Sequence, residues 1–135
     1  MLRRSFIRVL ASGILFTLLA KQSRQSLAKS QCAFEHGIAS GDPLADGFVI
    51  WTRVSGAEGR TVAVLWRVCA DAKMTKVLRE GVVETGPATD YTVKVDVRGL
   101  QCGARLYYQF IVEGVKSPVG KSRTLPSGDV EEARL

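Results

Sequence analysis

After about residue 33, apolar and polar side chains alternate with a period of two, and this alternation most narrows the folds open to the chain. Every second residue of Tyr91–Val97 is apolar, and Ala104–Glu113 and Thr61–Cys69 repeat the pattern. Successive side chains of a β-strand point to opposite faces, so each run predicts a strand with one buried face. Glycine-containing turns separate the runs, as is typical of a chain of short antiparallel strands.

Three further runs extend this set of predicted strands. Gly47–Val54 is strongly apolar and aromatic, Lys76–Glu84 is a weaker run suited to a sheet edge, and Gly120–Leu125 closes the set. We expect one short helical turn within Asp71–Arg79, and no other stretch after residue 29 shows a helical stripe of ten or more residues.

The predicted fold class is all-β: an immunoglobulin-like or fibronectin-III-like sandwich of about seven strands after an N-terminal signal helix. Six or seven short strands within the 107 residues after Ala28 suit this architecture. The two sheets are expected to enclose a core of large side chains, which includes Val64, Trp66, Val93, Tyr108 and Phe110.

The first 28 residues have the pattern of an export signal. Arg3 and Arg4 are followed one residue later by Phe6, as in twin-arginine signals, and the apolar run Val9–Ala20 has 12 residues. Such a run is shorter than the roughly 20 residues that span a bilayer, so we expect no stable membrane span. Small residues precede a predicted cleavage after Ala28.

Residues 1–28 are therefore predicted to be a twin-arginine-type signal peptide, recognised by the twin-arginine export machinery. The protein would then be exported, to the periplasm or the extracellular space. An ordinary secretory signal or an uncleaved N-terminal anchor are the alternatives for this segment.

The net charge of +6 does not indicate a nucleic-acid partner, because of where the charges lie. Residues 1–28 hold five basic residues and no acid, which leaves 14 basic and 13 acidic residues in the rest of the chain. A net charge of +1 leaves no basic face for a nucleic acid.

The residues show no catalytic constellation. His36 is the single histidine and the chain has no asparagine, so these residues cannot form a dinuclear metal site with several His and Asn ligands. Motifs such as C-x-x-C and G-x-S-x-G are also missing. We predict no catalytic, cofactor-binding or metal-binding residue on this chain.

The three cysteines are widely spaced. Cys69 ends one predicted strand and Cys102 lies at the corner before another, so these two are the candidate disulfide pair in an oxidising compartment. The alternative is that all three cysteines, with Cys32, act as small apolar side chains and at least one is free.

Several segments, in order along the chain, match the blocks of one known family. Phe34–Pro43 is similar to the opening F-x-x-G-V-A-S-G-D-P, Gly47–Val54 contains the I-W-T-R that ends the next strand, and Trp66–Asp71 corresponds to W-x-V-A-x-D. Later blocks complete the match, namely Asp90–Val95, Gly99–Leu100, Tyr107–Phe110 and Ser117–Pro126. The chain resembles the N-terminal domain of PhoD-type alkaline phosphatases, which are secreted, metal-dependent phosphomonoesterases and phosphodiesterases.

This resemblance implies a domain organisation and a function. Residues 29–126 would form the PhoD-like N-terminal sandwich, and residues 127–135 would be a linker toward a catalytic metallophosphatase domain. In the family that domain holds iron and calcium and hydrolyses phosphate esters; here no catalytic residue can be carried over, and no cofactor is expected on this chain.

We therefore expect a non-catalytic N-terminal domain of an exported PhoD-type alkaline phosphatase, truncated or split and inactive alone. The alternatives are a stand-alone exported immunoglobulin-like binding module and a non-functional gene remnant. A partner metallophosphatase domain would cover apolar outer-face residues, for which Trp51, Leu65 and Ile111 are the candidates.

The resemblance also has a local departure. Cys102 stands where the family commonly has proline, and Leu106 stands where it commonly has tyrosine. If that register holds, the corner before Leu106 lacks the hydrogen bond of a tyrosine hydroxyl.

Overall fold

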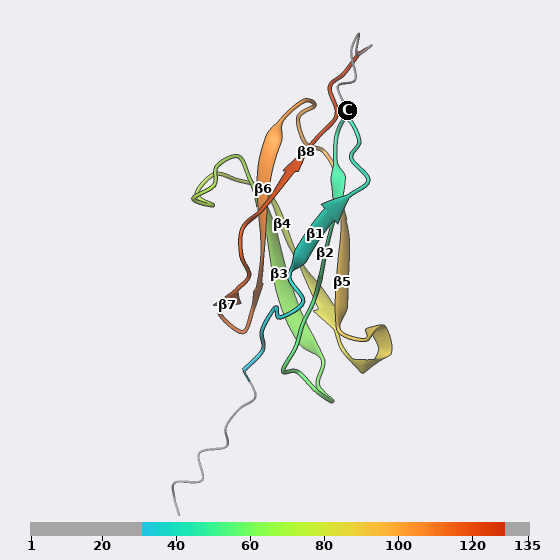
Figure 1. Ribbon diagram of the computed structural model, residues 1–135, viewed down its shortest axis with the longest axis vertical. Coiled ribbons are helices and arrows are strands. Elements are labelled where there is room, and N and C mark those ends of the chain that lie inside the picture. The colour runs from blue at the N-terminus through green and yellow to red at the C-terminus, as the bar shows by residue number, and fades with distance from the viewer. Residues whose placement is uncertain (1–30, 129–135) are drawn as a thin grey trace, which may run out of the picture.

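Eight β-strands and one short 3-10 turn make up the part of the chain that the computed structural model describes, residues 31–128. The strands form two antiparallel sheets that run along the long axis of the molecule (Figure 1). This confirms the predicted all-β sandwich. The predicted signal helix, with Arg3, Arg4, Phe6 and the cleavage after Ala28, lies outside the described residues, as do residues 129–135.

The smaller sheet has three strands in the order β1-β2-β5. They are β1 (Ile38–Gly41), β2 (Phe48–Arg53) and β5 (Thr92–Val97). Along β2, Phe48 and Ile50 are fully buried while Trp51 is 37% exposed, as the sequence alternation predicts. The strand β1 was not among the predicted strands, because four residues are too few to show a period of two.

The larger sheet has the order β4-β3-β6, with two short strands along the free edge of β6. Its strands are β3 (Val62–Cys69), β4 (Val77–Thr85), β6 (Arg105–Val112), β7 (Val115–Lys116) and β8 (Gly120–Arg123). The first half of β6 pairs with β8 and the last residues of β6 pair with β7. Figure 1 shows β8, in red, running beside β6.

The strands β7 and β8 are two parts of one edge strand that is interrupted at Pro118. Proline has no N–H to donate to the ladder, so it is confined to sheet edges. Ser117 holds the interrupted edge in place: its Oγ accepts a hydrogen bond from Phe110 N at 3.0 Å, and its own N–H donates to Phe110 O at 2.9 Å. The six predicted runs correspond to β2, β3, β4, β5, β6 and β8, and the observed count is eight because β1 and β7 add to them.

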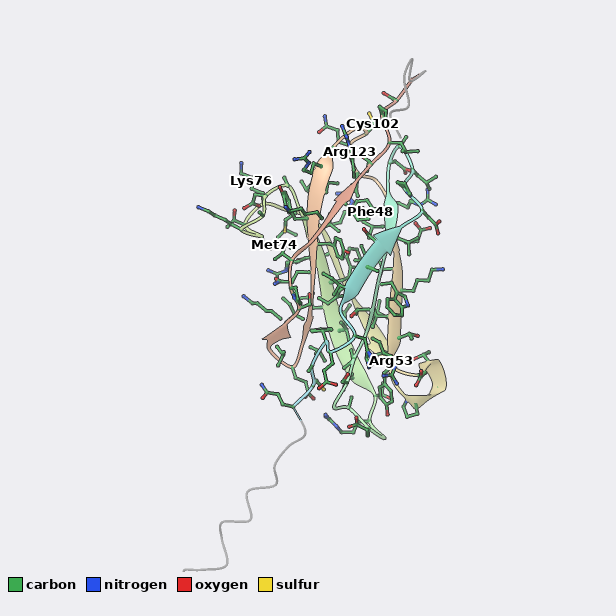
Figure 2. The ribbon with its side chains drawn as sticks, in the orientation of Figure 1. Phe48, Arg53, Met74, Lys76, Cys102 and Arg123 are labelled. Carbon is green, nitrogen blue, oxygen red and sulfur yellow. The ribbon has the colours of Figure 1, made fainter. Side chains whose placement is uncertain are left out.

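The core lies between the sheets and confirms the side chains predicted for it. Val64, Val93 and Phe110 are fully buried and Tyr108 is 3% exposed, while Trp66 is half-buried at the margin of the cluster. The rings of Tyr108 and Phe110 pack edge to face with their centroids 6.2 Å apart, a favourable geometry for aromatic pairs. Figure 2 labels Phe48, whose buried side chain comes from the opposite sheet.

The helical turn expected within Asp71–Arg79 is wrong. The segment is a tight loop followed by β4, which begins at Val77. The Asp71 carboxylate accepts hydrogen bonds from the N–H groups of Thr75, at 3.1 Å, and Lys76, at 2.7 Å. An aspartate that satisfies backbone donors in this way stabilises a loop in competition with a helix.

The corner before β6 is held by a threonine rather than by a tyrosine. Thr124 is fully buried, and its hydroxyl donates to Gln101 O at 2.6 Å and accepts from Ala104 N at 2.9 Å. Leu106, where the family commonly has tyrosine, packs in the core. The residue directly after β8, Thr124, thus supplies hydrogen bonds to this corner in place of the tyrosine hydroxyl.

Candidate functional site

The clearest apolar feature outside the core is a row of aliphatic side chains across the outer face of the larger sheet. Leu65 on β3 is the cross-strand partner of Val82 on β4 and of Ile111 on β6. Val82 is 62% exposed, and Leu65 and Ile111 are half-buried. We name Val82, Leu65 and Ile111 the aliphatic row. Three adjacent strands each contribute one residue to it, so it forms a continuous apolar strip.

A polar row lies beside the aliphatic row. Arg67 on β3 has Glu80 of β4 and Gln109 of β6 as its cross-strand partners. The Nε atom of Arg67 is buried and makes no hydrogen bond with any residue that the structure describes. A buried donor without a partner costs free energy, so Arg67 Nε is a locally unfavourable feature beside the aliphatic row.

The third candidate interface residue lies on the other side of the molecule. Trp51 is on the outer face of the smaller sheet, between Ala39 of β1 and Lys94 of β5. The structure therefore brings Leu65 and Ile111 together but separates Trp51 from them by the thickness of the sandwich. One flat partner surface cannot cover all three residues.

A polar cluster centred on Arg53 closes one end of the smaller sheet, and the sequence reasoning did not identify it. The Arg53 guanidinium donates to Asp90 Oδ1 at 3.0 Å and to Asp90 O at 3.1 Å, and it lies 2.9 Å from Nε2 of His36. The hydrogen bond from Arg53 lowers the pKa of Asp90, and the charge of Arg53 adds to the effect. Figure 2 shows Arg53 beside the loop that precedes β5.

Within this cluster His36 has a structural role. It accepts a hydrogen bond from a guanidinium and belongs to no group of three or more potential metal ligands among the described residues. Arg53 ends the I-W-T-R block, His36 lies in the first block and Asp90 opens a later one. One arginine thus joins three motif segments that are far apart in the sequence. The sequence indicated this cluster only in that all three residues lie within matched blocks.

The predicted disulfide between Cys69 and Cys102 is not formed: both cysteines, and Cys32, are free. Cys69 pairs with Tyr107, which lies five residues beyond Cys102. Cys102 lies in the turn before β6 and not on the strand that pairs with β3.

The two cysteines also have different surroundings. Cys69 is fully buried, and burial raises the pKa of its thiol. Cys102 is exposed at the corner, where its hydrogen bond with Ser127 lowers the pKa of its thiol. The environment of Cys69 therefore suits the alternative weighed above, a small apolar side chain.

Residues 31–128 contain no group of three or more His, Cys, Asp or Glu side chains that could hold a metal ion. In the same part of the chain, no helix has the length and hydropathy needed to cross a membrane.

Comparison with known proteins connects this sandwich to phosphatases. The family described as PhoD-like phosphatase, N-terminal domain, matches residues 19–126. Alkaline phosphatase D of Bacillus subtilis (strain 168) is 37% identical over 105 residues, which are 73% of this chain and 18% of that protein. The solved structure of PhoD matches with a TM-score of 0.65 and 36% identity over 70% of this chain and 19% of that chain.

A second solved structure shows the fold without a close sequence relationship. The sensor domain of the anti-sigma factor RsgI4 in Pseudobacteroides cellulosolvens matches with a TM-score of 0.54 and 11% identity. The match covers 75% of this chain and 99% of that one. By contrast, this chain spans less than a fifth of alkaline phosphatase D and of the solved PhoD chain. With a family match over most of its length and a fold that agrees, the chain belongs to the PhoD-like phosphatase N-terminal domain family.

Proposed function

We propose that this chain is the non-catalytic N-terminal sandwich of an exported PhoD-type alkaline phosphatase. The observation that carries the proposal is its 37% identity to one limited part of alkaline phosphatase D, 18% of that protein. Hydrolysis of phosphate esters would be catalysed by a metallophosphatase domain outside these 135 residues, whether on the same polypeptide or on a separate one. Iron and calcium would be held by that domain and not by this one.

The role proposed for the sandwich is to pack beside the catalytic domain and help shape the entrance of its active site. The aliphatic row is the docking surface that we assign to it. Its three residues are apolar, lie on adjacent strands and share one outer face of the larger sheet. Trp51 would need a different segment of the partner, because it lies on the opposite face.

A domain exchange in alkaline phosphatase D tests this function. Residues 29–126 would replace the matching segment of the B. subtilis enzyme, and hydrolysis of p-nitrophenyl phosphate would be measured with iron and calcium present. We expect a folded, active chimera, and a several-fold loss of kcat/KM when Leu65→Lys and Ile111→Lys are introduced together. Leu44→Lys, at an exposed leucine in the loop before β2, is the matched control.

Two results would contradict the proposal. One is a folded but inactive chimera, and the other is turnover of an aryl phosphate by the 135-residue chain alone that survives a mock purification. The DNA beyond the codon for Leu135 supplies an independent test, because metallophosphatase codons in frame, or one shift away, are expected there. Unrelated DNA would favour the stand-alone binding module or the gene remnant.

Export is part of the proposal and has its own test. The Arg3→Lys/Arg4→Lys double variant should retain the chain in the cytoplasm, because the twin-arginine machinery requires both arginines. Arg8→Lys, a change of the same kind in the same leader, should leave export intact. Equal export of both variants would point to an ordinary secretory signal.

A further inference from the structure

Three cations lie together on the outer face of the larger sheet, where β8 pairs with β6. Arg105 is the cross-strand partner of Arg123, and Lys121 lies two residues before Arg123 on the same face, opposite Tyr107. Directly opposed residues in an antiparallel pair have Cα atoms about 5 Å apart, and the next residue on the same face is about 6.8 Å along the strand. All three cations are exposed, and with Ser122 they line a shallow groove that is mostly open to solvent.

None of these three cations forms an ion pair with another residue among residues 31–128. The four ion pairs of the described chain use other arginines, namely Arg53, Arg60 and Arg98. Arg123 lies at the end of the sandwich opposite to Arg53, as Figure 2 shows. Like charges placed directly opposite each other destabilise a strand pair, so the Arg105–Arg123 pairing opposes folding unless an anion occupies the site.

Protection of the sheet edge accounts for only part of this arrangement. Charged residues on an edge strand discourage pairing with a second chain, and Lys121 and Arg123 on β8 can serve that purpose. Arg105 lies on β6, which is not the edge there, and it faces Arg123 directly. Protection of the edge does not require one arginine directly opposite another. Binding of an anion that accepts hydrogen bonds from both guanidinium groups does require this arrangement.

We propose that Arg105, Lys121 and Arg123 form a binding site for a phosphate group, either the free ion or a monoester carried on a larger molecule. Guanidinium groups match phosphate oxygens with two parallel hydrogen bonds, and an ammonium supplies a third positive charge. A group with two negative charges and several acceptor oxygens suits three cations better than a single carboxylate. The open groove leaves room for the rest of an ester. This inference does not rest on the proposed function, because it requires no catalysis and no second domain.

Titration of the ¹⁵N-labelled full chain with inorganic phosphate, followed by NMR at constant ionic strength, tests the site. We expect saturable shifts confined to the amides of Ala104–Tyr107 and Lys121–Thr124. Arg105→Gln or Arg123→Gln should each weaken binding at least tenfold, while the spectrum itself reports that the variant is folded. Lys94→Gln, at an exposed lysine of the smaller sheet, is the matched control and should bind as the unaltered chain does.

Two further ligands test whether the site binds free phosphate or a phosphate ester, and whether it prefers phosphate to a carboxylate. Glycerol 2-phosphate binding more tightly than inorganic phosphate would assign the site to an ester, and the reverse order would assign it to the free ion. Acetate as tight as phosphate, or shifts of equal size around Arg53 and Arg98, would overturn the proposal, since any anion or any arginine would then suffice. Phosphate binding that is seen only in the Glu131→Gln/Glu132→Gln variant would also overturn it, because the chain's own acidic residues would then be the occupant.

Discussion

Trp66 on β3 packs directly against Gly81, its cross-strand partner on β4. A Cβ atom added to Gly81 would lie 2.8 Å from Cζ2 of the Trp66 ring. The indole thus occupies the space that a side chain at position 81 would fill, and it covers the margin of the core from there. Glycine at this position is required by the close approach of the ring and not by an unusual backbone angle.

Gly81→Ala should therefore destabilise the sandwich by about 1–3 kcal/mol, because the added methyl group forces the indole away from the core. The measurement is urea unfolding followed by tryptophan fluorescence. Gly41→Ala is the matched control, since no atom lies within 4 Å of a Cβ built there, and it should change the free energy of unfolding by less than ~1 kcal/mol. An equal loss of unfolding free energy in both variants would contradict this, because it would show that the Trp66 ring moves aside without cost.

Thr124→Val tests the corner that lacks the family's tyrosine. Valine has nearly the same shape, but it cannot accept from Ala104 N or donate to Gln101 O, both of which bond to the Thr124 hydroxyl. Leaving these groups unpaired at a buried position should cost about 1–3 kcal/mol of unfolding free energy. Thr124→Ser keeps the hydroxyl and should recover most of the hydrogen-bonding part of that loss. A stable valine variant would mean that water replaces the hydroxyl.

The strands that the sequence predicts best are those with a long alternation. β3 and β6 each have eight residues and were placed to within a residue at each end, because one face of each strand lies along the core. β1 and β7 have four and two residues, too short to carry a periodic signal. The sequence pattern also predicted that Trp51, Leu65 and Ile111 point outward. It could not predict that they lie on two different sheets, because strand pairing depends on contacts between distant segments.

The ion pair between Arg53 and Asp90 should make stability depend on pH in the acidic range. The pKa of Asp90 is lower in the folded chain than its ordinary value of about 3.9, because Arg53 stabilises the carboxylate. Its contribution to stability is therefore complete above about pH 4 and is lost as the pH falls through the lower, folded pKa. The difference in unfolding free energy between the unaltered chain and Asp90→Asn should be constant near neutral pH and should shrink below about pH 4.

Asparagine is the appropriate replacement because Asp90 has a positive φ of 50°, which asparagine tolerates. Glu84→Gln is the control, at an exposed carboxylate that has no ion pair among residues 31–128. Added salt should reduce the Asp90 effect, since the pair is open to solvent. A difference that stays constant down to pH 2 would show that Arg53 holds Asp90 through the backbone carbonyl alone.

The aliphatic row predicts how the chain behaves when no partner domain covers it. Val82 is 62% exposed and adjoins Leu65, so the purified chain should bind a hydrophobic dye and associate at high concentration. Val82→Lys should reduce both effects and change the free energy of unfolding by no more than about 0.5 kcal/mol, because the side chain is largely in water already. Leu125→Lys changes a 46% exposed leucine outside the row and should leave association unchanged. Dye fluorescence and sedimentation velocity measure the two effects, and a chain that stays monomeric without dye binding would mean that the row needs no partner.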